Sequence, residues 1–510
     1  MRNAHFSITF IKPLTAPGHL FRFIGLKLIL ICHLAGFSDF SCQAQTAAER
    51  MKQVENGLMP WIQFQDSTPK RFSIRERMEA YQVPAVSIAV INNGQVEWAQ
   101  AYGLADVAEN RKATTNTIFQ AASISKSVNA LAVMKLVEEG KLSLDTDIRH
   151  YLKSWSFPDN EFSRNQPVTL AHLLSHTAGL NVHGFDGYAY GDSLPTLNQI
   201  LNGQRPANSP AVKPVNKPGI KYQYSGGGTV ITRKILEDNI SGDYAALLAE
   251  KVLKPLQMNH SSFAQPLSGQ QASMAATGYH EGGQAYKGKY HIYPELAPDG
   301  LWTTPTDLAR FIIAVQQSLK GGPGNFLKPE TTRKMLTPYL DSSKVALGFF
   351  LSNGETEPFF AHNGSNAGFN CDYFGSLHTG KGAVVMVNSD SYEIIYEIIN
   401  GIASVYNWKG FYKPVVKKLA SIPEDVLERY AGEYRFDENS GVLIRRVGHH
   451  LEIKGKADPH WETLYPVSGH EFHLFSNRLS YQFVSETGSD KPETLVLTNG
   501  RRSKKARKVE

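Results

Sequence analysis

The sequence predicts an α+β protein followed by a small all-β domain, and three observations support this prediction. Two β-rich regions, 83–106 and 346–389, are separated by a long stretch of helical and loop sequence. The first contains Asn92-Asn93-Gly94, a strong hairpin signal between two apolar runs. After residue 424, short β-like segments alternate with turn residues. We therefore expect the distant strand groups to form one sheet beside the helical middle, with a small barrel after it.

Size and charge narrow the class of protein. A chain of 510 residues is too long for one ordinary core, and 42% hydrophobic with 20% charged residues is typical of a soluble globular protein. The net charge is +6, but the last ten residues, "RRSKKARKVE", hold six basic residues and one acid. The rest is nearly neutral, so we expect no nucleic-acid partner. Membrane contact is expected only through an uncleaved signal or this basic tail.

The first 44 residues have the features of a secretory signal. Basic residues precede "LKLILICHLAGF" (26–37), an apolar stretch that is short for a membrane span. Cleavage after Ala44, lipid attachment at Cys42 and an uncleaved anchor are the alternatives. We expect an exported protein, periplasmic or extracellular, with membrane association through this segment as the variant case.

The cysteine count agrees with this expectation. Cys32 and Cys42 lie in or near the signal, which leaves Cys371 as the one cysteine of the mature chain. An internal disulfide is then excluded. We expect Cys371 to be a buried strand residue.

Composition shifts predict the domain boundaries. The signal covers 1–44 and the α+β domain 46–410. The segment 411–423 contains prolines and mixed charge, which favours a linker. The β domain covers 424–503, and 504–510 is the basic tail.

Four stretches of the α+β domain have helical patterns. The run "SKSVNALAVMKLVEEG" (125–140) is apolar nearly all round and ends at Gly140, which predicts a buried helix with a glycine cap. Further helices are expected in 168–180, 243–258 and 304–319, the last with "TPTD" as its start signal.

Ser123 and Lys126 stand together at the start of the first of these helices. Residues three apart lie on one helix face, within side-chain reach. A serine hydroxyl is a poor nucleophile until a neighbour removes its proton. A lysine can do so only when neutral, so its pKa must fall from about 10.4 towards roughly 7–8. The helix N-terminus adds a backbone N–H for a developing oxyanion. Alone, the motif is weak evidence, and it favours an N-cap serine with a snorkelling lysine over a catalytic pair.

Taken together, six stretches make the chain resemble the class C β-lactamase, penicillin-binding and esterase family of Ser-x-x-Lys serine hydrolases. In order over roughly 80–390 they are "IFQAASISKS", "VTLAHLLSHTAGL", "KPGIKYQYSGGG", "KPLQMNHSSF", "APDGLWTTPTDLARF" and "HNGSNAGFN". The resemblance implies a β-lactamase/transpeptidase-like fold, an antiparallel sheet flanked by helices with a helical subdomain. The later "YAGEYRF" is similar to a lipocalin-like appendage of some members.

The resemblance also implies roles for three residues. Ser123 resembles the acylated nucleophile and Lys126 its activating partner. "YSG" aligns with the family's Tyr-x-Asn element, so Tyr224 would exchange a proton with Ser123 and the leaving group. Tyr222 competes for this role, but the spacing from Pro218 and Gly219 favours Tyr224.

Four further residues are implied to bind substrate. Gly226 stands where the family usually has an asparagine that orients substrate amides; its absence favours a roomier site for esters or unusual amides. "HNG" resembles the third family motif, in which His362 holds a substrate carboxylate or polarises Tyr224. Gly364 would let substrate approach the backbone. By resemblance, the Ser365 N–H joins that of Ser123 as an oxyanion donor.

Two other patterns lead to no separate function. His172 and His176 have the spacing of a zinc-binding helix, but Leu173 stands where that motif has glutamate. We expect no metal and no cofactor. The chain also lacks the Gly-x-Ser-x-Gly elbow of the α/β-hydrolase fold.

The sequence therefore predicts an exported serine hydrolase that works through an acyl-enzyme. Its partner is a small-molecule or peptide substrate: a D-alanyl peptide with peptidoglycan as a candidate source, a β-lactam, or a D-amino-acid amide or ester. The alternative is a non-catalytic receptor that binds cell-wall fragments or peptides in the same pocket. For the β domain we expect a structural role; covering the active-site mouth, binding a ligand and self-association are the alternatives.

Overall fold

The computed structural model describes residues 45–65, 67–240, 242–340, 344–353, 357–438, 440–456, 460–485, 492–499 and 503–509. The expected signal at 1–44, with Cys32 and Cys42, lies outside the described residues. Thr46–Glu510 form one compact unit. Within the described ranges, no helix combines the length and the apolar character needed to cross a membrane.

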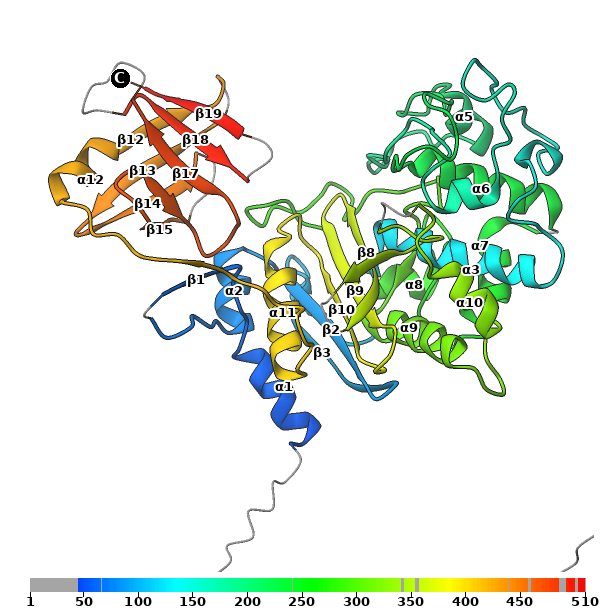
Figure 1. The fold of residues 1–510 in the computed structure, drawn as a ribbon, viewed down its shortest axis with the longest axis horizontal. Helices are drawn as coiled ribbons and strands as arrows, with labels where there is room; N and C mark the ends of the chain where they lie inside the picture. Colours follow the sequence, from blue (N-terminus) through cyan, green and yellow to red (C-terminus); the bar gives the residue numbers. More distant parts are fainter. Residues whose placement is uncertain are drawn as a thin grey trace, which may run out of the picture. The chain divides into compact units, whose positions relative to one another are not determined.

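A seven-stranded antiparallel sheet forms the centre of the α+β domain, in the order β4-β3-β2-β10-β9-β8-β7. Figure 1 labels its strands β3, β2, β10, β9 and β8. The first strand group supplies β2 (Ala85–Asn92), β3 (Gln95–Asp106) and β4 (Arg111–Lys112). The second supplies β7 (Phe350–Asn353), β8 (Pro358–Asn366), β9 (Phe369–Ser376) and β10 (Gly382–Val387). Strands β2 and β10 pair antiparallel, with Val86 opposite Val387. This confirms that the distant strand groups form one sheet.

The predicted hairpin joins β2 to β3. Asn93 and Gly94 have φ angles of 51° and 73°. Two successive residues with positive φ are what a two-residue hairpin turn requires, because its twist then matches that of the strands. Asparagine and glycine adopt this conformation at low cost.

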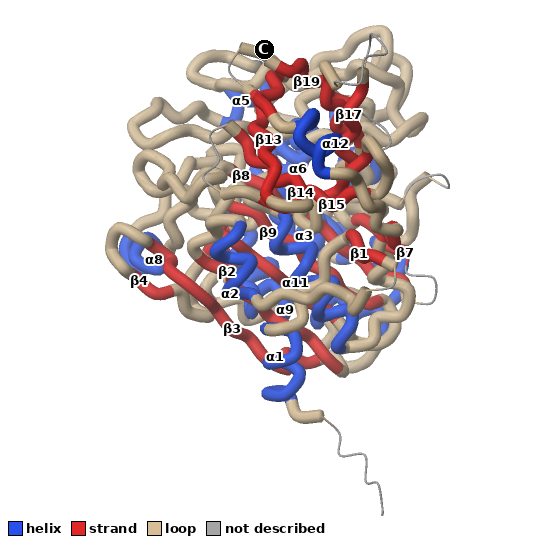
Figure 2. Tube along the Cα trace, turned by 90° about the vertical axis from the view of Figure 1, so that its left-hand side faces the viewer, coloured by secondary structure: helices blue, strands red, loops and turns tan. Residues whose placement is uncertain are grey.

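Helices cover both faces of the sheet (Figure 1 and Figure 2). On one face lie α1 (Ala47–Glu55), α2 (Ile74–Ala80) and α11 (Glu393–Val405), which share a core with Val86, Ile88 and Val90. On the other lie α3 (Ser125–Glu138) and α9 (Pro305–Lys320), which share a core with Ala85, Ala89 and Ile91. Successive β2 residues thus alternate between two apolar cores, which explains why the strand is almost wholly apolar.

The remaining helices form the helical subdomain and its connections. They are α4 (Leu170–Leu174), α5 (Leu197–Asn202), α6 (Gly226–Asn239), α7 (Tyr244–Leu248), α8 (Gly269–Met274) and α10 (Pro329–Met335). Helix α6 packs against α3, α4, α5 and α7. A two-stranded ladder joins β5 (Phe119–Gln120) to β6 (Trp302–Thr303).

The structure agrees with the predicted helices to different extents. The predicted helix at 304–319 is α9, whose N-cap Thr304 accepts a hydrogen bond from the Asp307 N–H, and α3 is followed by Gly140 with a φ of 71°. The stretch 168–180 yields only the short α4, because the chain turns at His176 with a φ of 55°. The stretch 243–258 yields α7 and then a π-helical turn, Ala249–Leu253.

After α12 (Glu424–Tyr430), the β domain is a closed eight-stranded barrel, as the sequence predicts. Leu451, Leu464, Phe472 and Leu495 are fully buried in its core. Its strands are β12 (Gly432–Arg435), β13 (Gly441–Val447), β14 (His450–Gly455), β15 (Glu462–Pro466), β16 (Glu471–His473), β17 (Ser480–Val484), β18 (Thr494–Thr498) and β19 (Ser503–Lys508).

The structure differs from the expected boundaries in two places. Within the expected linker, β11 (Val415–Lys417) pairs in parallel with β1 (Ile62–Phe64). Where we expected a basic tail, β19 pairs with both β18 and β12 and closes the barrel. Ala506 is fully buried in the barrel core, whereas its basic neighbours lie outward. The positive charges of Lys505 and Arg507 therefore belong to the outer face of a strand.

Candidate active site

Ser123 lies in a single 3₁₀ turn, Ala122–Ile124, between β5 and α3. Ala122 has a φ of 45°, a conformation that side chains rarely adopt. The hydroxyl of Ser125 donates to the Ala122 carbonyl at 2.5 Å and accepts the Leu301 N–H at 3.0 Å. The strained turn is thereby tied to the loop before β6, and Ser123 is held at the start of α3.

Lys126 occupies the first turn of α3 and is only 3% exposed. Its Nζ donates to Oγ of Ser123 at 2.9 Å, to the carbonyl oxygen of Pro298 at 3.0 Å and to Oδ1 of Asp299 at 3.3 Å. An ammonium group has three N–H donors, so each has an acceptor. The Ser123–Lys126 contact that the spacing predicts is present.

Asp299 is the residue that the sequence analysis missed. Its side chain is almost fully buried, and its Oδ1 accepts a hydrogen bond of 3.1 Å from the Ser123 hydroxyl. Among the described residues, its Oδ2 has no hydrogen-bond donor although it is buried. One carboxylate oxygen therefore contacts both Ser123 and Lys126. The one available signal was its place in "APDGLWTT", which the resemblance treated only as a family landmark.

The electrostatics of Lys126 contradict the sequence expectation. Burial lowers the pKa of Lys126, but the charge of Asp299 and the Tyr224 phenol raise it, and the net direction is upward from its ordinary value. We expected a lowered pKa and a neutral amine. The buried carboxylate instead stabilises the ammonium form, so Lys126 is a cation at neutral pH.

Tyr224 lies immediately before α6 and packs over Lys126. The Nζ of Lys126 is 5.1 Å from the centroid of the Tyr224 ring, a cation–π distance. The rings of His176 and His183 lie 4.3 Å and 4.8 Å from it, centroid to centroid. Tyr222, the competitor in sequence, is 41% exposed. The structure thus brings Tyr224 to the Ser123–Lys126 pair.

His176 supports Tyr224 from the protein interior. Its Nδ1 accepts the Ser225 N–H at 3.2 Å. Burial and the charge of Lys126 hold the pKa of His176 well below its ordinary value, so the ring is neutral. The Ser225 hydroxyl in turn accepts the Gly228 N–H at 3.0 Å and caps α6. The second histidine of "HLLSH" therefore fixes the backbone that carries Tyr224.

Gly226 does not open the site, contrary to our expectation of a roomier pocket. A Cβ at this position would lie 3.1 Å from the His183 carbonyl oxygen and 3.1 Å from the Phe185 ring. The segment 183–185 thus fills the space where a side chain would begin. The missing asparagine is replaced by a loop that packs on the first turn of α6.

The "HNG" residues lie on β8, beside the turn that carries Ser123. A Cβ on Gly364 would lie well inside van der Waals contact with the Ala121 carbonyl oxygen, so only glycine permits this approach. Asn363 and Ser365 are exposed at the cavity. His362 is buried, and burial and the Lys126 charge lower its pKa to about 3. A neutral, buried ring offers no charge to a substrate carboxylate; its contact with Tyr224 is a centroid distance of 6.4 Å.

A cavity of about 350 Å³ opens over these groups. Among the residues that the structure describes, its lining contains one anion, Asp299, and no lysine or arginine. The full lining is Ser123, His183, Gly184, Phe185, Tyr222, Tyr224, Asp299, Phe350, Asn363 and Ser365. The site is therefore a small, largely aromatic cavity with the reactive serine in its wall.

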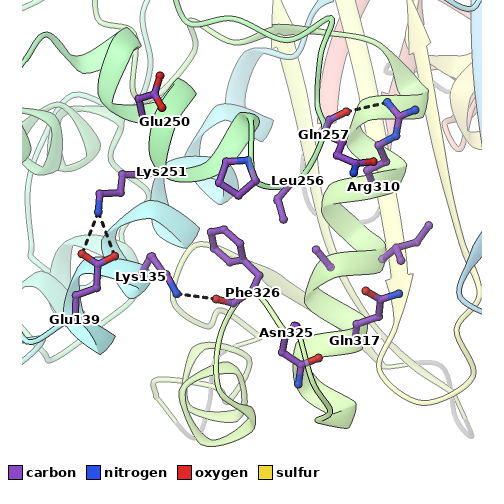
Figure 3. A pocket seen from close by; sticks show the side chains of 14 residues that line it. Lys135, Glu139, Glu250, Lys251, Leu256, Gln257, Arg310, Gln317, Asn325 and Phe326 are labelled. Carbon is purple, nitrogen blue, oxygen red and sulfur yellow. Dashed lines mark hydrogen bonds and ion pairs between the residues drawn. The ribbon is translucent and has the colours of Figure 1, made fainter.

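A larger cavity of about 580 Å³ lies at the other end of α3, and its lining contains none of the predicted catalytic or substrate-binding residues (Figure 3). Its charged groups are already engaged: Lys251 faces Glu139 at 3.0 Å, and Lys135 donates to the Phe326 carbonyl at 3.1 Å. We therefore place the candidate site at the smaller cavity.

This fold and this Ser-Lys-Tyr arrangement define a protein of the β-lactamase/transpeptidase-like class, and comparison with known families agrees. The chain belongs to the Beta-lactamase family, whose model matches residues 73–394. This confirms the resemblance seen in the motifs.

Cys371 is a buried residue of β9, as expected.

Individual relatives have low sequence identity to this chain. "Protein flp" of Staphylococcus aureus (strain MRSA252) is 27% identical over 338 residues, 62% of each chain. The chain thus spans less than two thirds of that relative. A teichoic acid D-alanine hydrolase of the same strain is 26% identical over 237 residues, 45% of this chain and 54% of the relative.

Two solved structures share the fold. An octameric penicillin-binding protein homologue from Pyrococcus abyssi has a TM-score of 0.58 and 25% identity, covering 85% of this chain and 98% of that chain. SurE has a TM-score of 0.52 and 19% identity, covering 86% and 97%, and shows the fold alone.

Proposed function

We propose that the protein is an exported serine hydrolase that forms an acyl-enzyme on Ser123 from an ester or amide. The observation that carries the proposal is the geometry of the serine. Its Oγ lies 2.9 Å from Nζ of Lys126 and 3.1 Å from Oδ1 of Asp299, in the wall of a cavity. Family membership supports a serine hydrolase in general.

In the proposed reaction, Ser123 Oγ attacks the substrate carbonyl carbon and the serine proton is removed. The oxyanion is received by the backbone N–H groups of Ser123 and Ser365, where Gly364 lets β8 approach. Tyr224 stands at the cavity to protonate the leaving group. Water then attacks the ester carbonyl of the acyl-enzyme and releases the acid.

The charge of the cavity narrows the substrate. Penicillins and D-alanyl-D-alanine peptides bear a carboxylate beside the scissile amide, and such a group needs a cation or strong donors. The described residues of the lining include no lysine or arginine, and His362 is neutral and buried. Asp299 adds a negative charge that Lys126 balances. We therefore favour esters or amides without a neighbouring carboxylate, among them D-alanyl esters. One of the relatives is named a teichoic acid D-alanine hydrolase.

Export is part of the proposal and rests on the composition of residues 1–44. A truncation series in the native host, or in a heterologous bacterium with a periplasm, tests it by fractionation. Recovery of the full-length chain in the cytosol would contradict export.

The first test of activity is the intact mass of the purified protein after reaction with a fluorophosphonate, beside Ser123→Ala. We expect one adduct on the wild type and none on the variant. Release of alcohol or amine from D-alanyl esters, D-amino-acid amides, simple esters and β-lactams then ranks the substrates. A folded wild-type protein without adduct, but with bound cell-wall fragments, would favour the receptor alternative instead.

A further inference from the structure

We propose that Asp299 is a further catalytic residue, which accepts the proton of the Ser123 hydroxyl when the serine attacks. This inference rests on the proposed function. In this proposal the group that accepts the serine proton in the first step is a carboxylate and not the lysine of the motif.

The hydrogen-bond directions around Ser123 carry the argument. Lys126 donates to the Ser123 oxygen, to the Pro298 carbonyl and to Asp299, which uses all three N–H groups of an ammonium. A fully protonated amine has no lone pair for another proton. The serine hydrogen points instead at Oδ1 of Asp299, 3.1 Å from Oγ. Within the described part of the chain, the carboxylate is thus the acceptor of that hydrogen.

The carboxylate is held in place by its own loop and by β8. The Asp299 N–H donates to the Leu296 carbonyl at 3.2 Å, and the Gly300 N–H to the same carbonyl at 2.7 Å. The side chain of Asn366 donates to the Asp299 carbonyl at 3.1 Å and to Gln120 at 2.7 Å. The loop therefore positions Oδ1 before substrate arrives, which is what proton transfer at a fixed distance requires.

In the proposed step, each bond that forms is matched by a bond that breaks. The O–H bond of Ser123 breaks and its proton binds Oδ1 of Asp299, while Oγ forms a bond to the carbonyl carbon and the C=O electron pair moves to oxygen. When the intermediate collapses, the C=O bond re-forms and the bond to the leaving group breaks. Tyr224 gives its hydroxyl proton to the leaving oxygen or nitrogen, and the proton held by Asp299 then restores the Tyr224 hydroxyl. Asp299 is then a carboxylate again, and Lys126 remains a cation throughout.

The other ionisable groups near this pair do not take over the role. Glu295, on the same loop, is buried, and burial raises its pKa to about 8, so it is mostly protonated at pH 7. Tyr293 of that loop has a raised pKa for the same reason. His362 on β8 is neutral. Among these neighbours, Lys126 and Asp299 remain the charged pair beside the serine.

The test is the second-order rate constant of fluorophosphonate labelling, measured by intact mass across pH 5–10 on the whole protein. Asp299→Asn keeps the shape but removes the proton acceptor, and we expect labelling at pH 7 to fall at least about 100-fold. The matched control is Asp106→Asn. Asp106 is also buried, accepts a hydroxyl hydrogen bond from Thr277 at 2.7 Å and pairs with Lys289 at 3.0 Å, and its variant should label close to the wild-type rate.

The pH profile separates a catalytic role from a structural one. In Asp299→Asn, Lys126 loses its counter-charge and becomes the only base of the pair, so residual labelling should rise towards alkaline pH as the amine loses its proton. Asp299→Glu keeps a carboxylate and should label faster than Asp299→Asn; it also serves if the asparagine variant does not fold. Circular dichroism confirms folding of each variant.

The outcomes are distinct. A wild-type protein that forms no adduct would contradict the proposed function itself. A labelled wild type with a folded Asp299→Asn variant that labels equally fast, or faster, would overturn the role of Asp299 and leave the hydrolase intact. An equal loss in Asp106→Asn would show that removing any buried carboxylate has this effect, and would overturn it too.

Discussion

The backbone N–H of Gly226 donates a hydrogen bond of 2.9 Å to the carbonyl oxygen of His183. This bond holds one wall of the cavity against the first turn of α6. The neighbouring Phe185 ring lies where a side chain at 226 would begin. The glycine and the loop are therefore one structural solution, and a change in either affects both.

Restoring the asparagine usual in the family, Gly226→Asn, should destabilise the protein rather than improve it. The added side chain must displace the segment 183–185, and such overpacking costs about 1–3 kcal/mol. Thermal unfolding measures the loss, and KM for an ester measures the change in the cavity. Gly469→Asn is the control, because a Cβ there meets no atom within 4 Å. Unchanged stability of Gly226→Asn would show that the loop moves freely.

Tyr224→Phe should reduce the acylation rate at least about 100-fold, because it removes a proton-transferring hydroxyl. Stability should change little, since the ring still packs against His176 and Lys126. Stopped-flow or burst kinetics with a chromogenic ester gives the rate. Tyr222→Phe is the matched control: it removes a hydroxyl from the same cavity and should leave the rate close to wild type. The reverse result would assign the role to Tyr222.

Asn363→Lys should widen the substrate range towards carboxylates. Asn363 is exposed on β8 at a cavity whose described lining residues include no lysine or arginine. A new ion pair at a partly exposed site is worth up to about 1 kcal/mol, which corresponds to a KM lowered up to about fivefold for a carboxylate-bearing donor. Comparing KM for that donor and for a neutral ester checks this. Asn363→Gln adds bulk without charge, and an equal effect there would remove the electrostatic explanation.

Glu295 should make the protein less stable as the pH rises. Burial raises its pKa from 4.5 to about 8 in the folded state. Between these values the folded state binds more protons than the unfolded state, so the free energy of unfolding falls with pH, by up to about 1.4 kcal/mol per unit from this group. Below pH 4.5 both states are protonated and the contribution is constant.

Glu295→Gln removes this dependence. Denaturant unfolding at a series of pH values from 4 to 9 gives both curves, and the difference between variant and wild type isolates Glu295 from the other buried acids. The variant should gain relative stability steadily between pH 5 and 8. A difference that does not change with pH would mean that the glutamate is charged in the folded state or that its pKa is ordinary.

Local patterns in the sequence predicted most of the fold. The sheet was predicted from the Asn93-Gly94 turn and from the apolar sequences of β2 and β10, because hairpin turns and burial leave patterns among neighbouring residues. The Ser123–Lys126 contact was predictable for the same reason. Tyr224 was predicted as a site residue only from the family resemblance, since nothing within its own segment connects it with Ser123.

What could not be predicted depends on contacts between distant segments. Asp299 reaches Lys126 from a loop far along the chain, and that contact reverses the expected direction of the lysine pKa. The β19 segment "SKKARK" has one apolar residue, Ala506, so its alternation is too weak to indicate a strand. Its pairing with β12 and β18 decides its structure instead.

The order of strands in the sheet also has a consequence for synthesis of the chain. β2 has β3 on one side and needs β10 on the other, and Val86 finds Val387 about 300 residues later. At a translation rate of about 5–20 residues per second, the β2–β3 hairpin emerges about 15–60 s before its partner. During that interval an apolar strand presents an open edge, which other chains can join. Delaying folding until the whole domain is available, as transport in an unfolded state does, would protect this edge from aggregation.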